Sequence, residues 1–382
     1  MKILMIGNGF DLAHGLPTTY ADFLCFCRLV EPIYESWMSA LEYEEKILKE
    51  WKKSSEITEF LKNIHSQTER KRKMGDDKKY YTEIITNCEM LDGFYSNIQG
   101  NLWIQYFQQQ FSRMGENWID FELEISKIIQ EMEILKEYTK GMELPQDGLD
   151  EITYLIQSIA GKSIKDVCHP YCCLGYFKRD LETDLNRLIR ALEIYLSEFV
   201  NKIDIENRNP DINELEVTHI LSFNYTDTYA RMYDVLNAKK YDYIHGKANS
   251  DHTLETNNMV LGIDEYLPED RRNRETEFIS FKKYYQRIYK ETGCKYKAWV
   301  EFIRYNKRMD HRLYIFGHSL DETDGDILRD LILNDNVYTT IYYWNKEMMG
   351  KQIANLVKVI GQNELIQRTG GRRKTIMFQK QQ

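Results

Sequence analysis

The chain has 382 residues, with 51 lysines and arginines against 60 aspartates and glutamates, so its formal net charge is −9. This length suits about two structural units with a core that needs no disulfide bonds. The acidic balance excludes a global attraction to nucleic acids or to anionic membranes. The 42% hydrophobic content supplies enough apolar side chains for a core and excludes disorder of the whole chain.

The sequence also bears on membrane segments, redox state and metals. It contains no run of about 20 apolar residues, and its first apolar run, 3–6, is too short for a signal peptide. We therefore predict a cytoplasmic protein that does not contact a membrane. The seven cysteines are an odd number without paired C-x-x-C motifs, which predicts reduced thiols. Cys168, Cys172 and Cys173 surround His169, but this spacing matches no common zinc pattern, so we predict no metal there.

Predicted strands and helices alternate at the start and in the last third of the chain. The apolar run Ile3–Ile6 ends in a glycine turn and predicts a buried strand. Further runs of β-branched and aromatic residues predict strands at Val217–Ser222, Tyr241–Ile244, Met259–Gly262, Leu313–Phe316, Val337–Tyr343 and, as an edge strand, Thr375–Phe378. Helical patterns occupy 227–236, 281–291, 323–333 and 346–360. Such alternation is typical of a parallel sheet.

Between these parts the pattern is helical. Leucines recur at helical spacing, for example at Leu181, Leu185 and Leu188, and a basic segment at 69–81 predicts a solvated loop. We predict an α/β fold in which a Rossmann-like parallel sheet flanked by helices is interrupted by a large all-helical insertion. The predicted α/β domain comprises 1–30 and 215–382, and the predicted insertion comprises 31–214.

A polar motif follows the first predicted strand, where ligands of open parallel sheets bind. In Gly7-Asn8-Gly9-Phe10-Asp11, two glycines let a phosphate approach the start of a helix. Leu12 replaces the third glycine of the dinucleotide fingerprint, so a simple tight turn is an equal alternative. Asp11 would repel a phosphate, and we expect it to face a ribose or a metal ion.

Two further motifs follow the second and third of these strands. Asn224 can both donate and accept hydrogen bonds, which suits a ribose hydroxyl or a water molecule. Capping of the next helix by Asn224 or Thr226 is an equal alternative, and Asp227 follows them. His245, beside Gly246, is a candidate general base because histidine titrates near neutral pH. A hydrogen-bonded structural histidine is the alternative.

The fourth motif contains Gly317, His318 and Ser319, followed by four acidic residues at Asp321, Glu322, Asp324 and Asp326. The glycine permits close approach of a ligand, whereas the acids argue against a phosphate. They suit sugar hydroxyls, a base edge or a divalent cation, with helix capping by Thr323 or Asp324 as the alternative.

A separate acidic pair occurs in the insertion. Asp120 and Glu122 are two residues apart, so on a helix they point to different faces.

Together these motifs resemble the abortive-infection AbiH family of anti-phage proteins. The resemblance covers nearly the whole chain, and its matching segments are 3–24, 118–122, 223–226, 245–246 and 314–324. It implies a role in phage defence, in which an infected cell stops growing or dies before new phage is released.

The order of the motifs also resembles sirtuin-like NAD-binding domains. By this analogy Gly7 and Gly9 hold the diphosphate, and Asn224 orients the ribose or a water. Asn8 and Phe10 of the same turn are further candidate ligand-binding residues. The analogy makes His245 the base and has Gly317 with Ser319 line the adenosine side. His318 and Asp324 of the same motif are further candidate ligand-binding residues. It implies cleavage of NAD. This sequence departs from the sirtuin-like pattern in three ways. The acid that follows the asparagine lies at 227 instead of 226, and Asp11 stands where sirtuins keep a small neutral residue. The paired zinc cysteines are missing, which argues against deacylation.

We therefore compare three functions. The favoured one is an enzyme that hydrolyses NAD or a related nucleotide, with Asp11, Glu122 or Asp227 stabilising the oxocarbenium-like transition state. The alternative is a non-catalytic module that senses a nucleotide and binds a phage or host protein. A nuclease using the basic runs 70–73 and 372–374 is disfavoured by the acidic total. Self-association into a homo-oligomer is compatible with the first two.

Overall fold

The structure, a computed structural model, describes residues 1–35, 38–51, 53–74, 88–115, 120–139, 153–154, 156–159, 161 and 173–382. The chain forms two compact units. The sheet unit comprises Met1–Thr18, Asn201–Ala248 and Lys290–Gln382, and the helical unit comprises Thr19–Val200 and Asn249–Tyr289. The chain thus passes from the sheet unit into the helical unit after Thr18. Residues 249–289, which we assigned to the α/β domain from sequence, group with the helical unit.

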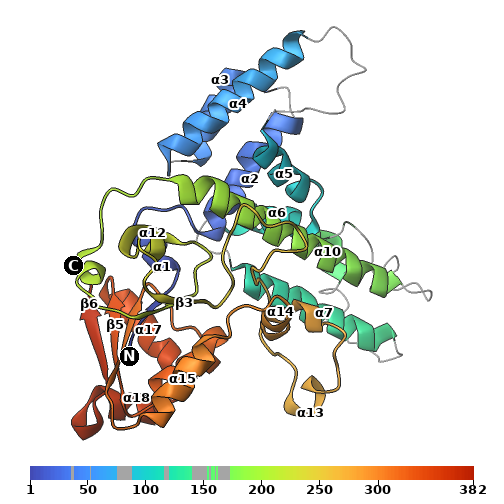
Figure 1. The fold of residues 1–382 in the computed structure, drawn as a ribbon. Coiled ribbons are helices and arrows are strands. Elements are labelled where there is room, and N and C mark those ends of the chain that lie inside the picture. The colour runs from blue at the N-terminus through green and yellow to red at the C-terminus, as the bar shows by residue number, and fades with distance from the viewer. Residues whose placement is uncertain are drawn as a thin grey trace. The chain divides into compact units, whose positions relative to one another are not determined.

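Six strands of the described residues form one sheet in the order β3-β2-β1-β4-β5-β6 (Figure 1). Their bounds are β1 Lys2–Ile6, β2 His219–Ser222, β3 Lys240–Tyr243, β4 His311–Phe316, β5 Val337–Tyr343 and β6 Ile376–Lys380. All five pairings are parallel. This confirms the predicted α/β fold with a parallel sheet, and the strand order is compatible with a Rossmann-like sheet.

The helices of the sheet unit cover both faces of the sheet. They are α1 Asn8–Ala13, α11 Pro210–Asn213, α12 Thr228–Tyr233, α15 Tyr296–Tyr305, α16 Gly325–Ile332, α17 Lys346–Ile360 and α18 Gln362–Thr369. Ile3 and Met5 of β1 pack into one core with α15 to α18, whereas Leu4 and Ile6 pack into the other with α1, α11 and α12. Because side chains alternate along a strand, a central strand buried on both faces is apolar throughout.

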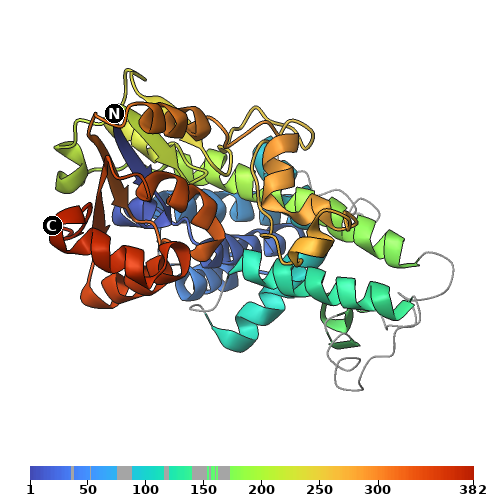
Figure 2. The same cartoon turned by 90° about the horizontal axis from the view of Figure 1, so that it is seen from below.

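The C-terminal helices and strands form one end of this unit. Helices α17 and α18 lie beside β5 and β6 in both views (Figure 1, Figure 2). Among the described strands β6 pairs only with β5, which confirms the predicted edge strand near the C-terminal end of the sequence.

The helical unit contains the two longest helices of the described residues, α4 Ser55–Met74 and α10 Cys173–Ile194. Its other helices are α2 Tyr20–Glu35, α3 Ala40–Glu50, α5 Glu89–Ile98, α6 Leu102–Met114, α7 Phe121–Thr139, α13 Glu269–Arg272 and α14 Lys283–Tyr289. Leu181, Leu185 and Leu188 lie buried on one side of α10, as their spacing predicts. Among the described helices, none is long and apolar enough to cross a membrane.

Two predicted elements differ from the structure. Met259–Gly262 is not a strand, because the side-chain amide of Gln286 bonds both the N–H and the carbonyl of Leu261 in place of a strand partner. The predicted loop at 69–81 begins later than expected, since α4 continues to Met74 and carries the basic residues on a helix. The rest of that loop lies outside the described residues.

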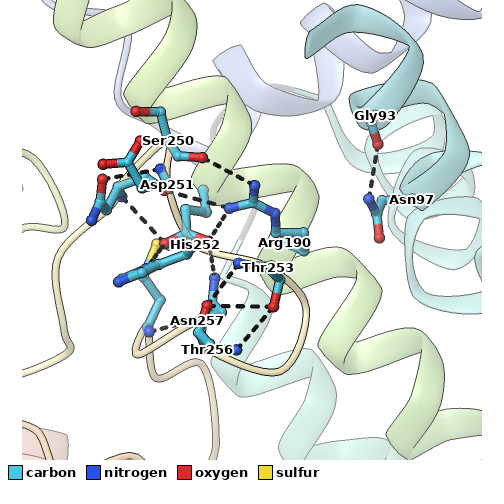
Figure 3. A network of polar contacts seen from close by, with 12 residues as sticks. Gly93, Asn97, Arg190, Ser250, Asp251, His252, Thr253, Thr256 and Asn257 are labelled. Atoms are coloured by element: carbon cyan, nitrogen blue, oxygen red, sulfur yellow. Dashed lines mark hydrogen bonds and ion pairs between the residues drawn. The ribbon is translucent and has the colours of Figure 1, made fainter. Parts of the chain in front are cut away.

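A buried carboxylate holds a returning segment inside the helical unit. Glu193 of α10 is fully buried, and its oxygens bond the backbone N–H of Asn249 at 3.2 Å, Nδ1 of His252 at 2.6 Å and the side-chain amide of Asn257. Arg190, one turn earlier, pairs with Glu193 and also reaches the carbonyl of Ser250 (Figure 3). The segment 249–257 is therefore fixed to α10 by a single acidic side chain and its partners.

Candidate functional site

The four predicted motifs all lie at one edge of the sheet, since they follow strands that run in the same direction. Strand β1 lies between β2 and β4. The chain leaves β1 toward one side of the sheet and β4 toward the other, and such a switch point is where open α/β sheets bind ligands.

Three glycines let the turns after β1 and β4 touch. A Cβ atom at Gly317 would lie 2.2 Å from the backbone nitrogen of Phe10, and one at Gly9 would lie 2.8 Å from Cα of Gly317. Gly317 also has a φ of +68°, which favours glycine. A Cβ atom at Gly7 would likewise lie 2.8 Å from the carbonyl oxygen of Gly317. These glycines are therefore required by the packing of one turn on the other.

This packing changes the role predicted for the glycine turn. The N–H of Gly9 donates to the carbonyl of Gly317 at 2.8 Å, that of Gly7 to Phe316 at 3.2 Å and that of Phe10 to Gly7 at 2.8 Å. These three donors are used within the protein and do not supply the cradle expected for a diphosphate. The side chain of Phe10 is fully buried in the core. Asn8 is exposed and accepts a bond from Thr18.

Asp11 forms the centre of a buried polar cluster with residues that follow β2. It is 1% exposed, and its Oδ2 accepts a hydrogen bond of 2.6 Å from Thr226, which in turn accepts one from Thr228. Neither Asn224 nor Thr226 caps α12, so the capping alternative is wrong for both. The alternate residues 224, 226 and 228 supply the polar atoms, a pattern of period two that would have identified Thr228 from sequence.

The pKa of Asp11 is raised to about 6, mainly because burial removes water from the ionised carboxyl. The hydrogen bond from Thr226, the nearby hydroxyl of Thr228, the charge of Arg231 and the nearby amide of Asn224 each lower the pKa and oppose part of this effect. Asp11 therefore titrates close to neutral pH, which is unusual for an aspartate and typical of functional carboxyls.

Asn224 is positioned by its backbone. Its N–H and carbonyl both bond the hydroxyl of Ser222, the last residue of β2. The side chain is 5% exposed, and neither atom of its amide forms a hydrogen bond within the described residues. The same holds for Oδ1 of Asp11. Buried polar atoms of this kind are rare and call for a bonding partner such as a ligand or an ordered water.

Two histidines and one carboxylate form a second cluster at this edge. His245 follows β3 and His318 follows β4, and Nε2 of these rings lies 3.7 Å and 3.5 Å from the two oxygens of Asp324. All three side chains are buried. The ring of Phe223 contacts both imidazoles edge to face, with centroids at 5.6 Å and 4.3 Å. Phe223 thereby links the histidines to Asn224, the next residue in the chain.

The rim of the site carries opposite charges. Asp227 pairs with Arg231 at 3.1 Å and with Lys247 at 3.1 Å, and these groups are partly exposed. Arg231 lies close enough to lower the pKa of Asp11. Neither Arg231 nor Lys247 could be identified from sequence, because a lone arginine on a helix and a lone lysine in a loop carry no distinctive spacing.

Other predicted residues lie apart from these clusters. Ser319 is exposed, and its carbonyl accepts a bond from Asn355. The side chain of Asp321 caps the turn at Glu322–Asp324, whereas that of Asp324 makes no capping bond to α16, so the predicted capping by Asp324 is wrong. Glu122 belongs to the helical unit, where it pairs with Lys283 at 2.6 Å.

The metal predictions have two outcomes. Within the described residues no group of three or more histidines, cysteines or acids is arranged to hold a metal ion. The acidic motif at 321–326 is among the residues to which this applies. Cys168, His169 and Cys172 lie outside the described residues, and so does the side chain of Cys173.

The fold and the edge of the sheet define an α/β protein with a buried polar site at its topological switch point. The family model "Bacteriophage abortive infection AbiH" matches residues 3–344, and the chain belongs to this family. Among curated proteins and among solved structures, none matches the chain. Membership implies a role in abortive infection by bacteriophage. The resemblance to sirtuin-like domains stays a prediction.

Proposed function

We propose that the sheet unit binds a ribose-bearing nucleotide such as NAD and hydrolyses its N-glycosidic bond as its contribution to phage defence. The observation that supports this most is the buried edge cluster, in which the amide of Asn224 and Oδ1 of Asp11 lack bonding partners among the described residues. Vicinal ribose hydroxyls supply both donors and acceptors, so they satisfy an amide and a carboxylate together.

The catalytic groups fit an oxocarbenium-like transition state. Asp11, with its pKa of about 6, is mostly ionised above neutral pH and would stabilise positive charge that develops on the ribose. His245 would act as the general base. Asn224 would bind the ribose hydroxyls and hold the sugar against these two groups.

A water oxygen forms a bond to C1′ of the ribose while the bond from C1′ to the nicotinamide nitrogen breaks. The electron pair of that bond returns to the pyridinium ring, which leaves as neutral nicotinamide, and His245 takes the proton of the water. The products are nicotinamide, ADP-ribose and one proton.

The phosphates of the nucleotide would lie on the rim beside Arg231 and Lys247. The backbone donors of Gly7, Gly9 and Phe10 are already bonded, and Asp11 and Asp324 would repel an anion. Arg231 and Lys247 are the cations that contact Asp227 at this edge, and an entering phosphate would replace that carboxylate between them.

Burial supports the second candidate, a module that binds a nucleotide without turnover. Asp11 is 1% and His245 7% exposed, so a substrate would reach them only if the surrounding turns open. A sensing module would show a nucleotide-dependent rise in melting temperature while NAD stays intact.

The test uses cells that express the full chain, with and without phage. We expect NAD to fall after infection and nicotinamide with ADP-ribose to appear, as measured by chromatography. Asn224→Ala and His245→Ala should abolish the fall at equal protein levels. Asn207→Ala, at an exposed position of the same unit, is the matched control. Protection against phage with an unchanged NAD pool would contradict the hydrolase.

A further inference from the structure

The carboxylate of Asp324 is shared by two histidines that come from different strands. Nε2 of His245 lies 3.7 Å from Oδ1, and Nε2 of His318 lies 3.5 Å from Oδ2. His245 is 7%, His318 5% and Asp324 8% exposed, so all three are removed from bulk water. The arrangement is not explained by capping, because the side chain of Asp324 makes no capping bond to α16.

One backbone hydrogen bond defines the tautomer of His318. The N–H of Leu320 donates to Nδ1 of His318 at 2.9 Å. A nitrogen that accepts a hydrogen bond carries no proton, so the ring proton of His318 lies on Nε2, which faces Asp324. His318 is therefore a fixed donor directed at one oxygen of the carboxylate.

The turn that supplies this bond is held in an unfavourable conformation. Leu320 has a φ of +60°, a left-handed conformation that is unfavourable for a residue with a side chain. Its side chain is fully buried in the core of the sheet unit, and the carbonyl of His318 accepts a bond from Gln352 of α17. Packing from two sides thus keeps the N–H of Leu320 directed at the imidazole.

We propose that His318 is a positioning residue, which holds the Asp324 carboxylate so that it orients His245 as the base. This rests on the proposed function. The carboxylate, whose Oδ1 lies 3.7 Å from Nε2 of His245, favours the proton on that nitrogen by charge, so Nδ1 of the ring takes the proton of the attacking water. Asp324 then lies beside the imidazolium that forms and stabilises its charge, as the carboxylate of a catalytic triad does.

Two substitutions separate this role from simple packing. His318→Gln keeps an acceptor for Leu320 and an amide donor toward Asp324, whereas His318→Phe keeps a planar ring and removes both. The control is His219→Phe, which replaces another buried histidine at the start of β2, at the opposite edge of the sheet. Circular dichroism and thermal melting verify that each full-length variant is folded.

The first measurement determines by NMR which ring nitrogen of each histidine carries the proton. It uses protein with isotope-labelled histidine and needs no substrate. We expect Nε2–H tautomers at both His245 and His318 in the wild type. We expect a mixed tautomer at His245 in His318→Phe, and the wild-type pattern in His318→Gln and His219→Phe. An Nδ1–H tautomer at His245 in the wild type, or no change in His318→Phe, would overturn the proposal.

The second measurement is NAD hydrolysis. In His318→Phe we expect kcat to fall roughly tenfold to a hundredfold with KM unchanged, less than the ~10²–10⁴-fold that a general base supplies. His318→Gln should recover most of this loss. Absence of NAD turnover with the expected tautomers contradicts the proposed function alone, whereas normal kcat in a folded His318→Phe contradicts the positioning role.

Discussion

Thr226 donates a hydrogen bond of 2.6 Å to Oδ2 of Asp11 across a sequence separation of 215 residues. The bond joins the helix after β1 to the turn after β2, inside the sheet unit. It lowers the pKa of Asp11, but burial outweighs it and leaves that pKa at about 6. The folded protein consequently contains a carboxyl group whose ionised form is unfavourable.

The first prediction concerns stability and pH in Asp11→Asn. Well below pH 3.8 Asp11 is protonated in folded and unfolded chains alike. As the pH rises toward 6 the unfolded chain loses its proton first, so the wild type loses up to about 3 kcal/mol of stability. The asparagine has no such titration and still accepts from Thr226. We expect it to be more stable than wild type at pH 8, with the difference shrinking toward pH 4.

Denaturant unfolding at pH 4 to 8 measures this difference. Asp326→Asn, at an exposed position of α16, should keep the pH dependence of the wild type. The prediction fails if the stability difference between Asp11→Asn and wild type is independent of pH. Loss of NAD hydrolysis in a variant that is more stable would also show that the buried acid is retained for function.

The positions of the site residues at the strand ends can be predicted from the sequence better than the contacts between them. The strands carrying the motifs are short apolar runs, and parallel direction brings their carboxyl ends to one edge, so the placement of Asn224 and His245 follows from pattern alone. Contacts between motifs are set by tertiary packing. Nothing in the spacing indicates that Gly9 faces Gly317, or that Gln286 replaces a strand partner of Leu261.

The second prediction is that Gly317→Ala unfolds or strongly destabilises the sheet unit. Its φ is +68°, and the added Cβ would lie 2.2 Å from the nitrogen of Phe10, a backbone atom that cannot move without displacing α1. We expect a loss of at least about 3 kcal/mol. Gly350→Ala on α17 is the matched control, because its Cβ meets no atom within 4 Å and alanine favours a helix by about 1 kcal/mol. Comparable melting temperatures for the two variants would refute the packing role.

The third prediction tests the phosphate position on the rim. Lys247→Gln removes one of the two cations that contact Asp227. We expect KM for NAD to rise roughly threefold to tenfold, equivalent to about 1 kcal/mol of binding. KM for nicotinamide riboside, which has no phosphate, should be unchanged. Lys240→Gln, at the other end of β3, is the control. An equal effect on both substrates would place the phosphates elsewhere.

The fourth prediction concerns the segment 249–257 of the helical unit. Glu193→Gln keeps the shape of the side chain but removes the charge that holds Arg190, His252 and Asn257. Because charge-assisted hydrogen bonds contribute about 1.5–3 kcal/mol each, we expect a loss of roughly 2–4 kcal/mol. The released segment should be cut by a non-specific protease at concentrations that leave the wild type intact. Mass spectrometry of the fragments locates the cuts, and Glu59→Gln on the exposed side of α4 is the control. Cleavage in Glu193→Gln confined to sites outside 249–257 would show that the segment is held by other contacts.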